Sequence, residues 1–268
     1  MRGAGAQGPK VQGLEAKGIT VRYGRRGVLD GLDLPPLRPG EVTVLAGPNA
    51  AGKSTLLRAI AQLQPYRGQV LLDGADLARM PAQVRARAVG FMPQTLPAGS
   101  SLVALESVVA ALRAGGTIPA HQADTTAMAV MEKLGIAALA LEPLSALSGG
   151  QRQMVSLAQA IVRDPRLLLL DEPTSALDMA RQVRLLSELR RLAGEGRIVV
   201  AVLHDLGLAA QWADRIVLMH GGQTHASGRP DEVLTPALLA QVYGVTARVE
   251  RCSQGRIMIL IDGEHAPT

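Results

Sequence analysis

The sequence predicts an α/β fold with a largely parallel sheet. Segments 41–45, 167–170 and 197–203 are apolar runs rich in leucine, valine and isoleucine, as expected of strands buried on both faces. Helical spacing of apolar residues follows each run. A glycine-rich turn at residues 47–52 joins the first run to its helix, and this order of strand, turn and helix is typical of ligand-binding α/β proteins.

Composition allows one large domain or two small ones with an aliphatic core. Of the 268 residues, 47% are hydrophobic and only 2% are aromatic. The single cysteine, Cys252, permits no internal disulfide and suits a reducing compartment. Basic residues give a net charge of +5 but are scattered, so no nucleic-acid partner is expected.

Neither a membrane span nor a signal peptide is expected. No run of about 18 apolar residues occurs in the sequence. Residues 1–10 lack the apolar stretch of a signal peptide, and we predict that residues 1–13 form a flexible tail. The protein is therefore expected in the cytosol unless a partner holds it at a membrane.

Two strands are predicted before the glycine-rich turn, at residues 18–23 and 28–34, joined by a turn at residues 24–27. Tyr23 ends the first of them in a chain with few aromatic residues. Its ring has two equally weighted roles at this stage: it fills the core or an edge, or it stacks on an adenine.

The turn after the first buried strand has the phosphate-loop pattern, a glycine, four free positions and Gly-Lys-Ser. Its backbone N–H groups and the start of the next helix can surround one anion. Lys53 can bridge two phosphates and the Ser54 hydroxyl can ligate Mg²⁺. A chance glycine-rich turn is the plain alternative, and the flanking strand and helix disfavour it. The predicted nucleotide site comprises Gly47, Pro48, Asn49, Ala50, Ala51, Gly52, Lys53, Ser54 and Thr55.

An all-helical block is predicted to interrupt the alternation of strands and helices. Strands are expected at residues 68–74 and 88–94, and from residue 101 to 163 the apolar spacing becomes helical. Ser101 and Asp124 are the predicted N-caps of two helices in this block. We interpret it as an inserted subdomain.

A second glycine-rich turn, Leu-Ser-Gly-Gly-Gln at residues 147–151, opens a helix at the end of this block. It can form another nest of N–H groups for an anion. An ordinary N-cap explains Ser-Gly-Gly equally well. Its position between a phosphate loop and an acidic strand favours the anion site.

The buried strand at residues 167–170 ends in two carboxylates, at the edge where parallel sheets bind ligands. Asp171 suits Mg²⁺, directly or through water, and Glu172 suits the activation of an attacking water. An acidic strand end at the surface is the plain alternative, which Lys53 makes less favoured. His204 ends the strand 197–203 and is predicted to face a γ-phosphate rather than to be structural.

The remainder of the chain predicts, in order, helices at 175–192 and 206–212, a hairpin around Gly221 and Gly222, a helix at 231–243 and a terminal hairpin of 247–252 and 256–262.

Together the motifs resemble the ATP-binding subunit of ABC transporters. They are GPNAAGKST (47–55), Gln94, LSGGQ (147–151), LLLLDEP (167–173), SALD (175–178) and His204. The resemblance runs from about residue 14 to residue 245. The sequence around LSGGQ and LLLLDEP, with the C-terminal segments ARVERC and GRIMILIDG, is most similar to that of the ATPases of iron-chelate importers. The substrates of that family include ferric siderophores, haem and cobalamin.

The resemblance implies a RecA-like phosphate-loop NTPase core that carries an N-terminal antiparallel β subdomain and an inserted α-helical subdomain. The implied domains are a discontinuous nucleotide-binding core at 14–92 and 164–245, a helical signalling subdomain at 93–163 and a small C-terminal β extension at 246–268.

It also implies a homodimer that holds two ATP molecules between its copies. Lys53 and the loop amides of one copy bind each triphosphate, and the second copy closes over it with Ser148, Gly149, Gly150, Gln151 and Asp178. Two glycine nests around one anion add donors and exclude water. The implied Mg²⁺ ligands are Ser54, Gln94 and Asp171, the implied catalytic residues are Glu172, His204 and Gln94, and Tyr23 stacks on adenine.

The implied activity is Mg²⁺-dependent ATP hydrolysis that powers uptake of a metal chelate through a separate membrane permease. Gln94 and the helical block report the nucleotide state to that permease, and a substrate-binding protein acts indirectly. The chain is then peripheral, on the cytoplasmic side of the inner membrane. One residue departs from the pattern: Ala50 stands where the family usually has glycine, which costs roughly 1 kcal/mol if the position needs positive φ.

Two other functions remain open at this stage. A soluble ABC-type ATPase could act as a scaffold in iron–sulfur assembly or DNA maintenance. The short helical block without a heptad run disfavours the DNA branch. A binding module without hydrolysis would need a missing carboxylate or histidine, and both Glu172 and His204 are present.

Overall fold

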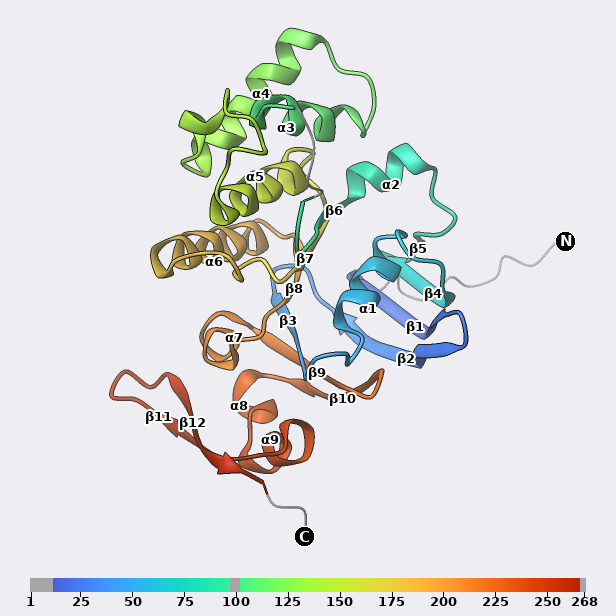
Figure 1. Ribbon diagram of the computed structural model, residues 1–268. Helices are drawn as coiled ribbons and strands as arrows, with labels where there is room; N and C mark the ends of the chain where they lie inside the picture. Colours follow the sequence, from blue (N-terminus) through green and yellow to red (C-terminus); the bar gives the residue numbers. More distant parts are fainter. Residues whose placement is uncertain (1–11, 97–101, 266–268) are drawn as a thin grey trace, which may run out of the picture.

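A six-stranded sheet forms the centre of the molecule. The computed structural model describes residues 12–96 and 102–265, and within them this sheet has the order β10-β9-β3-β8-β7-β6 (Figure 1). The parallel strands are β3 (Val42–Ala46), β6 (Val89–Met92), β7 (Leu167–Asp171), β8 (Ile198–Val202) and β9 (Arg215–His220). Only β10 (Gln223–Gly228), on the edge, is antiparallel. The predicted α/β fold is confirmed.

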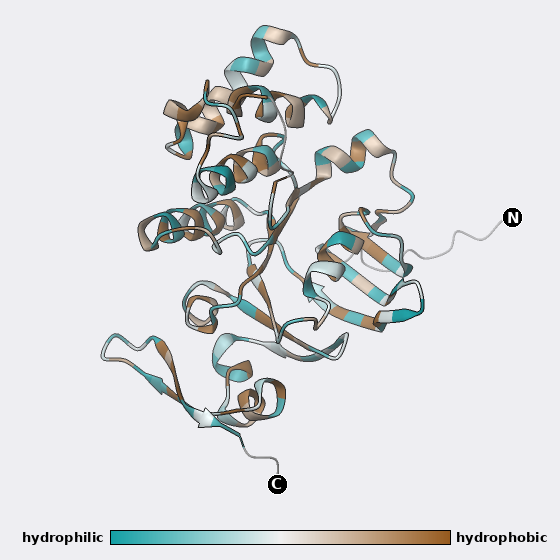
Figure 2. Ribbon diagram, viewed as in Figure 1, coloured by the Kyte–Doolittle hydropathy of each residue, from teal (hydrophilic) through white to brown (hydrophobic). Residues whose placement is uncertain are grey.

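Alternate residues of the buried strands face two different hydrophobic cores. In β7, Leu168 and Leu170 join a core with α5 (Gly149–Ile161) and α6 (Met179–Gly194). Leu167 and Leu169 join a second core with α1 (Lys53–Ile60) and the N-terminal strands. Because both faces are covered, β7 has apolar residues from Leu167 to Leu170. Figure 2 shows the central strands as mostly hydrophobic.

The N-terminal region forms an antiparallel sheet of order β2-β1-β4-β5 beside α1. Its strands are β1 (Leu14–Tyr23), β2 (Arg26–Leu37), β4 (Arg67–Leu72) and β5 (Ala75–Asp76). The turn predicted at 24–27 is wrong in length, because Tyr23 pairs with Arg26 and Arg22 with Gly27. Gly24, with φ 59°, supports the shorter turn. Residues 1–11 of the predicted tail lie outside the described residues, and Gly13 exchanges two hydrogen bonds with Asp73.

The helical block lies at the end of the molecule opposite the C-terminal hairpin (Figure 1). It contains α3 (Ala104–Arg113), α4 (Ala120–Lys133), the short η1 (Ala137–Leu139) and α5. The predicted cap Asp124 is wrong, because Pro119, five residues earlier, is the N-cap of α4, which buries Ala123 in the core. Ser101 lies outside the described residues; α3 begins after Val103, whose N–H donates to Glu106. The helix α2 (Ala82–Ala88) had not been predicted, since none of its residues is buried and it lacks an apolar stripe.

The C-terminal region departs from the prediction at one point. The helix expected at 231–243 is two helices, α8 (Pro230–Val233) and α9 (Pro236–Tyr243). Pro236 cannot donate within a continuing helix, and Thr235 caps the new one by accepting from Leu238 N at 3.3 Å. The helix predicted at 175–192 is present as α6, which begins at Met179 after the N-cap Asp178, and the helix predicted at 206–212 is present as α7 (Leu206–Trp212). The terminal hairpin consists of β11 (Val245–Arg251) and β12 (Ile257–Glu264). Among the described residues, every helix is too short or too polar to span a bilayer.

Candidate functional site

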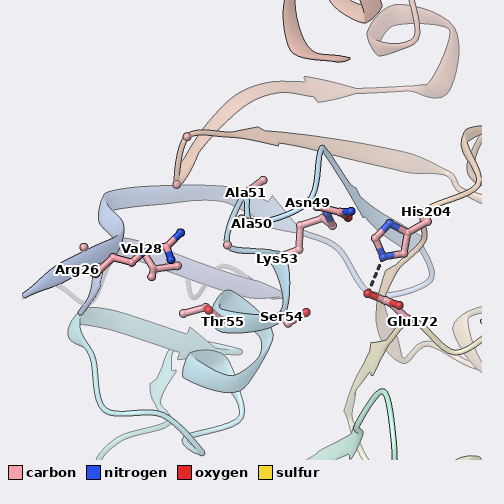
Figure 3. A pocket seen from close by; sticks show the side chains of 14 residues that line it. Arg26, Val28, Asn49, Ala50, Ala51, Lys53, Ser54, Thr55, Glu172 and His204 are labelled. Atoms are coloured by element: carbon pink, nitrogen blue, oxygen red, sulfur yellow. Dashed lines mark ion pairs between the residues drawn. The ribbon is translucent and has the colours of Figure 1, made fainter. Parts of the chain in front are cut away.

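A cavity at the carboxyl ends of β3, β7 and β8 is lined by the predicted site residues 49–55, Glu172 and His204. Its volume is about 410 Å³. The wall consists of the loop after β3, the start of β2, the turn between β9 and β10, and two side chains that follow β7 and β8 (Figure 3). The lining residues are Arg26, Gly27, Val28, Asn49, Ala50, Ala51, Gly52, Lys53, Ser54, Thr55, Glu172, His204, Gly221 and Gly222.

Backbone geometry explains the glycines of the phosphate loop. A Cβ on Gly47 would lie 2.1 Å from the Met219 carbonyl oxygen, and one on Gly52 would lie 2.6 Å from a Leu29 methyl carbon. Both glycines also have positive φ, 142° and 95°. Ala50 has φ 62°, so the strain anticipated for an alanine here is present, at about 1 kcal/mol.

Lys53 is a buried cation at the first position of α1, with 5% exposure. Its ammonium donates to the carbonyl oxygens of Gly47 at 2.6 Å and Pro48 at 2.8 Å. An ammonium has three donors, so one remains for an anion in the cavity. Burial lowers the pKa of Lys53, and the nearby charges of Glu172 and Asp171 oppose this.

Asp171 and Ser54 form an oxygen cluster that fits a small divalent cation. Ser54 Oγ donates to Asp171 Oδ1 at 2.7 Å. The Asp171 side chain is fully buried, and its Oδ2 has no hydrogen-bond partner among the described residues. The nearest cation is the Arg58 guanidinium, at 3.8 Å. Burial raises the pKa of Asp171 against the opposing hydrogen bond from Ser54. A hard cation with oxygen ligands such as Mg²⁺ would satisfy the free oxygen.

Three predicted catalytic side chains meet at Glu172. Its Oε1 lies 2.6 Å from His204 Nε2, and its Oε2 accepts from Gln94 Nε2 at 2.7 Å (Figure 3 shows the first contact). They come from the ends of β7, β8 and β6, so the parallel sheet brings together residues far apart in the chain. Glu172 has φ 52°, a left-handed conformation that is rare for a residue with a side chain.

The second glycine-rich turn starts α5 as a capping box. Ser148 Oγ accepts from Gln151 N at 3.3 Å, and Gln151 Oε1 accepts from Ser148 N at 2.8 Å. The ordinary capping role is thus present, and the Ser148 O–H remains able to donate to an anion. Asp178 caps α6 by accepting from Arg181 N at 2.8 Å. None of these residues lines the cavity of its own chain.

Tyr23 is not brought to the cavity within this chain. It ends β1 with 46% exposure, and the wall beside it consists of Arg26, Gly27 and Val28. Stacking on adenine stays a prediction.

Sequence reasoning missed two residues that support the site. Gln153 is 5% exposed and binds the backbone of Glu172; its place four residues before Leu157, on the apolar face of α5, was an available signal. Burial raises the pKa of Tyr243 to about 12, and an interaction with the backbone of Gly47 opposes this. A tyrosine in a chain with so few aromatic residues was a weaker signal.

Comparisons with known proteins give a consistent set of similarities. Residues 31–175 match the sequence family described as ABC transporter. The chain is 42% identical over 233 residues to the hemin import ATP-binding protein HmuV of Rhodococcus jostii, covering 86% of this chain and 80% of that protein. It is 35% identical over 246 residues to the achromobactin transport ATP-binding protein CbrD of Dickeya dadantii, covering 88% and 89%.

Solved structures show the same fold. The chain is similar to a dimeric bacterial ABC transporter cassette, with a TM-score of 0.73 and 27% identity over 81% of this chain and 98% of the cassette. A post-hydrolysis dimer of that cassette with ADP and phosphate matches with a TM-score of 0.74 at 27% identity, over the same shares of both chains.

Proposed function

The chain belongs to the ABC transporter family, and from that premise we propose that it is the ATP-hydrolysing subunit of an importer for an iron chelate. The observation that carries the catalytic part is the meeting of Glu172, His204 and Gln94 beside the phosphate loop. A carboxylate held in this way, next to a buried lysine, fits activation of a water against a phosphoryl group.

Binding of the triphosphate relies on the loop after β3. Its N–H groups and the positive end of the α1 dipole attract the phosphates. Lys53 donates to the phosphates with the ammonium hydrogen that its two carbonyl partners, Gly47 and Pro48, leave unused. One of these carbonyls can also give up its hydrogen bond to a phosphate oxygen. Exchange of a carbonyl for a phosphate oxygen gives the desolvated ammonium a full counter-charge.

Mg²⁺ would be held by Ser54, Asp171 and Gln94. The free Oδ2 of Asp171 supports this assignment. A cation held there would supply positive charge to offset the negative charge on the phosphate oxygens. The protein's share is to present oxygens already fixed in position, Asp171 by β7 and Ser54 by α1.

Glu172 orients the attacking water and accepts hydrogen-bonding from it, while His204 contacts the γ-phosphate. Both Glu172 oxygens are already engaged, by His204 and Gln94. Each carboxylate oxygen has a second lone pair, so a water can donate a hydrogen bond to Glu172 while both contacts persist. In-line attack of water then yields ADP and phosphate.

A second copy of the chain completes the site. Ser148, Gly149, Gly150, Gln151 and Asp178 lie outside the cavity of their own chain, which supports their action on the nucleotide of the partner. The similar cassette is a dimer. Donors from two chains enclose the γ-phosphate more completely than either turn alone.

The cargo is inferred from the relatives. Two of them are described as import or transport ATP-binding proteins for hemin and achromobactin, so an iron complex, haem or a ferric siderophore, is the proposed substrate of the assembly. The partners are membrane permease subunits and, indirectly, a substrate-binding protein. The chain is then peripheral on the cytoplasmic side of the inner membrane. The scaffold alternative has no observation in its favour.

Replacement of Glu172 by glutamine tests the catalytic proposal. Glu172→Gln should keep ATP binding, lower Mg²⁺-dependent turnover by at least about 100-fold and accumulate an ATP-bound dimer. Turnover assays and light scattering measure these effects. Normal turnover would contradict the role of Glu172, and a monomer at saturating ATP would contradict the two-chain site.

Reconstitution tests the cargo. The chain, co-expressed with its membrane permease subunits, should co-purify with them and support ATP-driven uptake of haem or a ferric siderophore into vesicles. Matched vesicles with Glu172→Gln are the control. Uptake of neither, by a complex that hydrolyses ATP, would overturn the proposed cargo and leave the ATPase assignment intact.

A further inference from the structure

Glu172 has a backbone conformation that needs support from its surroundings. Its φ of 52° is left-handed, and it precedes Pro173, a position that disfavours helical backbone. Such conformations persist where neighbouring groups over-determine them. The Glu172 carbonyl oxygen accepts from Gln153 Nε2 at 3.1 Å, from Ser175 Oγ at 3.1 Å and from Ser175 N at 3.3 Å. The first of these donors, Gln153, belongs to helix α5, far from Glu172 in the sequence.

The side-chain amide of Gln153 forms all its hydrogen bonds with the segment that follows β7. Besides the Glu172 carbonyl, its Nε2 donates to Ser175 Oγ at 3.0 Å, and its Oε1 accepts from Ala176 N at 3.2 Å. The side chain is buried, with 5% exposure. Both amide hydrogens and the oxygen therefore bind the segment from Glu172 to Ala176, which fixes the peptide plane that sets the direction of the Glu172 side chain.

The same helix begins with the second glycine-rich turn, and that turn packs on the same segment. A Cβ on Gly150 would lie 2.9 Å from the Ala176 carbonyl oxygen, and one on Gly149 would lie 3.3 Å from the Ala176 Cβ. Close packing of this kind leaves little room for the turn to move independently. The start of α5 and the segment from Glu172 to Ala176 therefore form one packed unit.

We propose that Gln153 is a positioning residue that sets the orientation of Glu172 in its own chain and ties it to the glycine-rich turn that contacts the partner's nucleotide. This inference rests on the two-chain site proposed above. Closure of the turn over the partner's ATP then changes the orientation of Glu172 in the same chain, which acts on the other ATP. Gln153 itself touches neither nucleotide.

Steady-state kinetics of the full chain in its permease complex give the first test. Gln153→Leu removes all three hydrogen bonds, whereas Gln153→Glu keeps an acceptor for Ala176 N and removes the amide donors to Glu172 and Ser175. Both should lower kcat about tenfold with KM for ATP within about twofold. Ser156→Ala is the matched control, because Ser156 is a buried polar residue of the same helix whose hydroxyl has no partner among the described residues. Its kcat should be unchanged.

A structural role alone would lower the thermal midpoint and leave kcat per folded molecule intact, and that result would overturn the proposal. Gln153→Glu keeps the test valid if Gln153→Leu does not fold. Absence of hydrolysis by the unaltered complex would instead refute the proposed function, so the two failures are distinguishable.

Mixed dimers give the sharper test, because they separate action within a chain from action across the interface. One dimer carries Gln153→Leu and Glu172→Gln in the same chain; the other carries them in opposite chains. In the first, the remaining Glu172 belongs to a chain with intact Gln153, so its turnover should be several-fold higher. Equal rates would overturn the proposal. The reverse order would show that Gln153 acts through the turn on the partner's nucleotide instead.

Discussion

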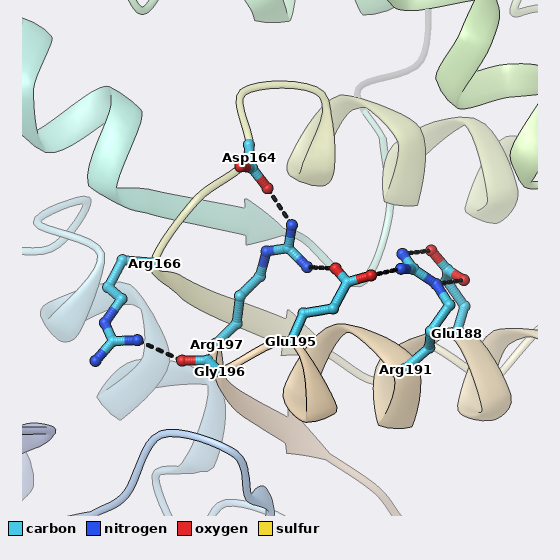
Figure 4. Close-up of polar contacts among 7 residues, drawn as sticks. All are labelled: Asp164, Arg166, Glu188, Arg191, Glu195, Gly196 and Arg197. Atoms are coloured by element: carbon cyan, nitrogen blue, oxygen red, sulfur yellow. Dashed lines mark hydrogen bonds and ion pairs between the residues drawn. The ribbon is translucent and has the colours of Figure 1, made fainter.

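The two ends of the central strands β7 and β8 both carry clusters of charge, and the clusters differ in how their charges are partnered. At the amino end, Arg197 pairs with Asp164 and Glu195, and Arg191 pairs with Glu188 and Glu195 (Figure 4). At the carboxyl end, Asp171 Oδ2 has no hydrogen-bond partner among the described residues. The charges at the amino end are paired with each other and hold the strand ends together. At the carboxyl end, a carboxylate oxygen without a hydrogen-bond partner in the described part of the chain can bind an added ligand.

The pKa directions follow the same division. Burial alone would lower the pKa of Arg197, but the hydrogen bonds that it donates to Asp164 and Glu195 outweigh burial and raise the pKa. At the other end burial prevails: it raises the pKa of Asp171 and lowers that of Lys53. The amino end therefore favours its charged groups, and the carboxyl end tolerates them at a cost in stability.

Lys53→Ala should give the largest effect, at the carboxyl end. Loss of the buried ammonium removes a charge-assisted contact to the phosphates, so the dissociation constant for Mg²⁺-ATP should rise by about 100-fold or more. Calorimetric titration measures it, and circular dichroism checks that the fold is retained. Unchanged affinity would contradict the central assignment of the cavity.

Asp171→Asn should separate function from stability. An amide of the same size relieves the buried charge, whose Oδ2 has no hydrogen-bond partner among the described residues, so the nucleotide-free protein should gain about 1 kcal/mol in its free energy of unfolding. Mg²⁺-dependent turnover should fall by tenfold or more, since a carboxylate ligand is lost. Chemical denaturation and turnover assays measure the two effects. A loss of stability would mean that the Asp171 charge is stabilised by its surroundings, as the charges at the amino end are, and would contradict the difference between the two ends.

Arg197→Gln should do the opposite at the amino end. The side chain bridges two carboxylates and is only 18% exposed, yet the carboxylates are solvated, so we expect a loss of about 1 kcal/mol in the free energy of unfolding. Turnover per folded molecule should stay within about twofold. A large loss of turnover with little change in stability would mean that this network also serves catalysis.

Ala50→Gly should give the smallest effect and sharpen the comparison within the phosphate loop. Glycine tolerates the φ of 62° found there, so the free energy of unfolding should rise by up to about 1 kcal/mol. Ala51→Gly is the matched control: Ala51 is buried without positive φ, so it should lose stability by a similar amount. Equal losses in both variants would mean that the loop does not store strain at Ala50.

Sequence predicted best the features that local pattern determines. The apolar run of β7 and the phosphate loop were both in place, because strand burial and glycine spacing leave a direct mark on the sequence. The convergence of Glu172 and His204 followed from parallel strands ending at one edge. The roles of the individual site residues and the domain boundaries remain predictions.

Features that depend on tertiary contacts were missed. Gln153 binds a backbone carbonyl 19 residues away, and a backbone partner leaves no pattern of residue types. The early start of α4 follows from burial of Ala123 in the helical block, which outweighs the capping preference of Asp124. The break before Pro236 was visible as a proline inside a predicted helix, and the apolar spacing on both sides obscured it.

The most direct test of the account compares the two ends in one assay: steady-state ATP turnover per folded molecule, with and without Mg²⁺, for the unaltered chain, Glu172→Gln and Arg197→Gln. The account predicts Mg²⁺-dependent turnover that is abolished by Glu172→Gln and retained by Arg197→Gln. Retained turnover in Glu172→Gln, or an equal loss in both variants, would contradict the claim that hydrolysis resides at the carboxyl end of the sheet.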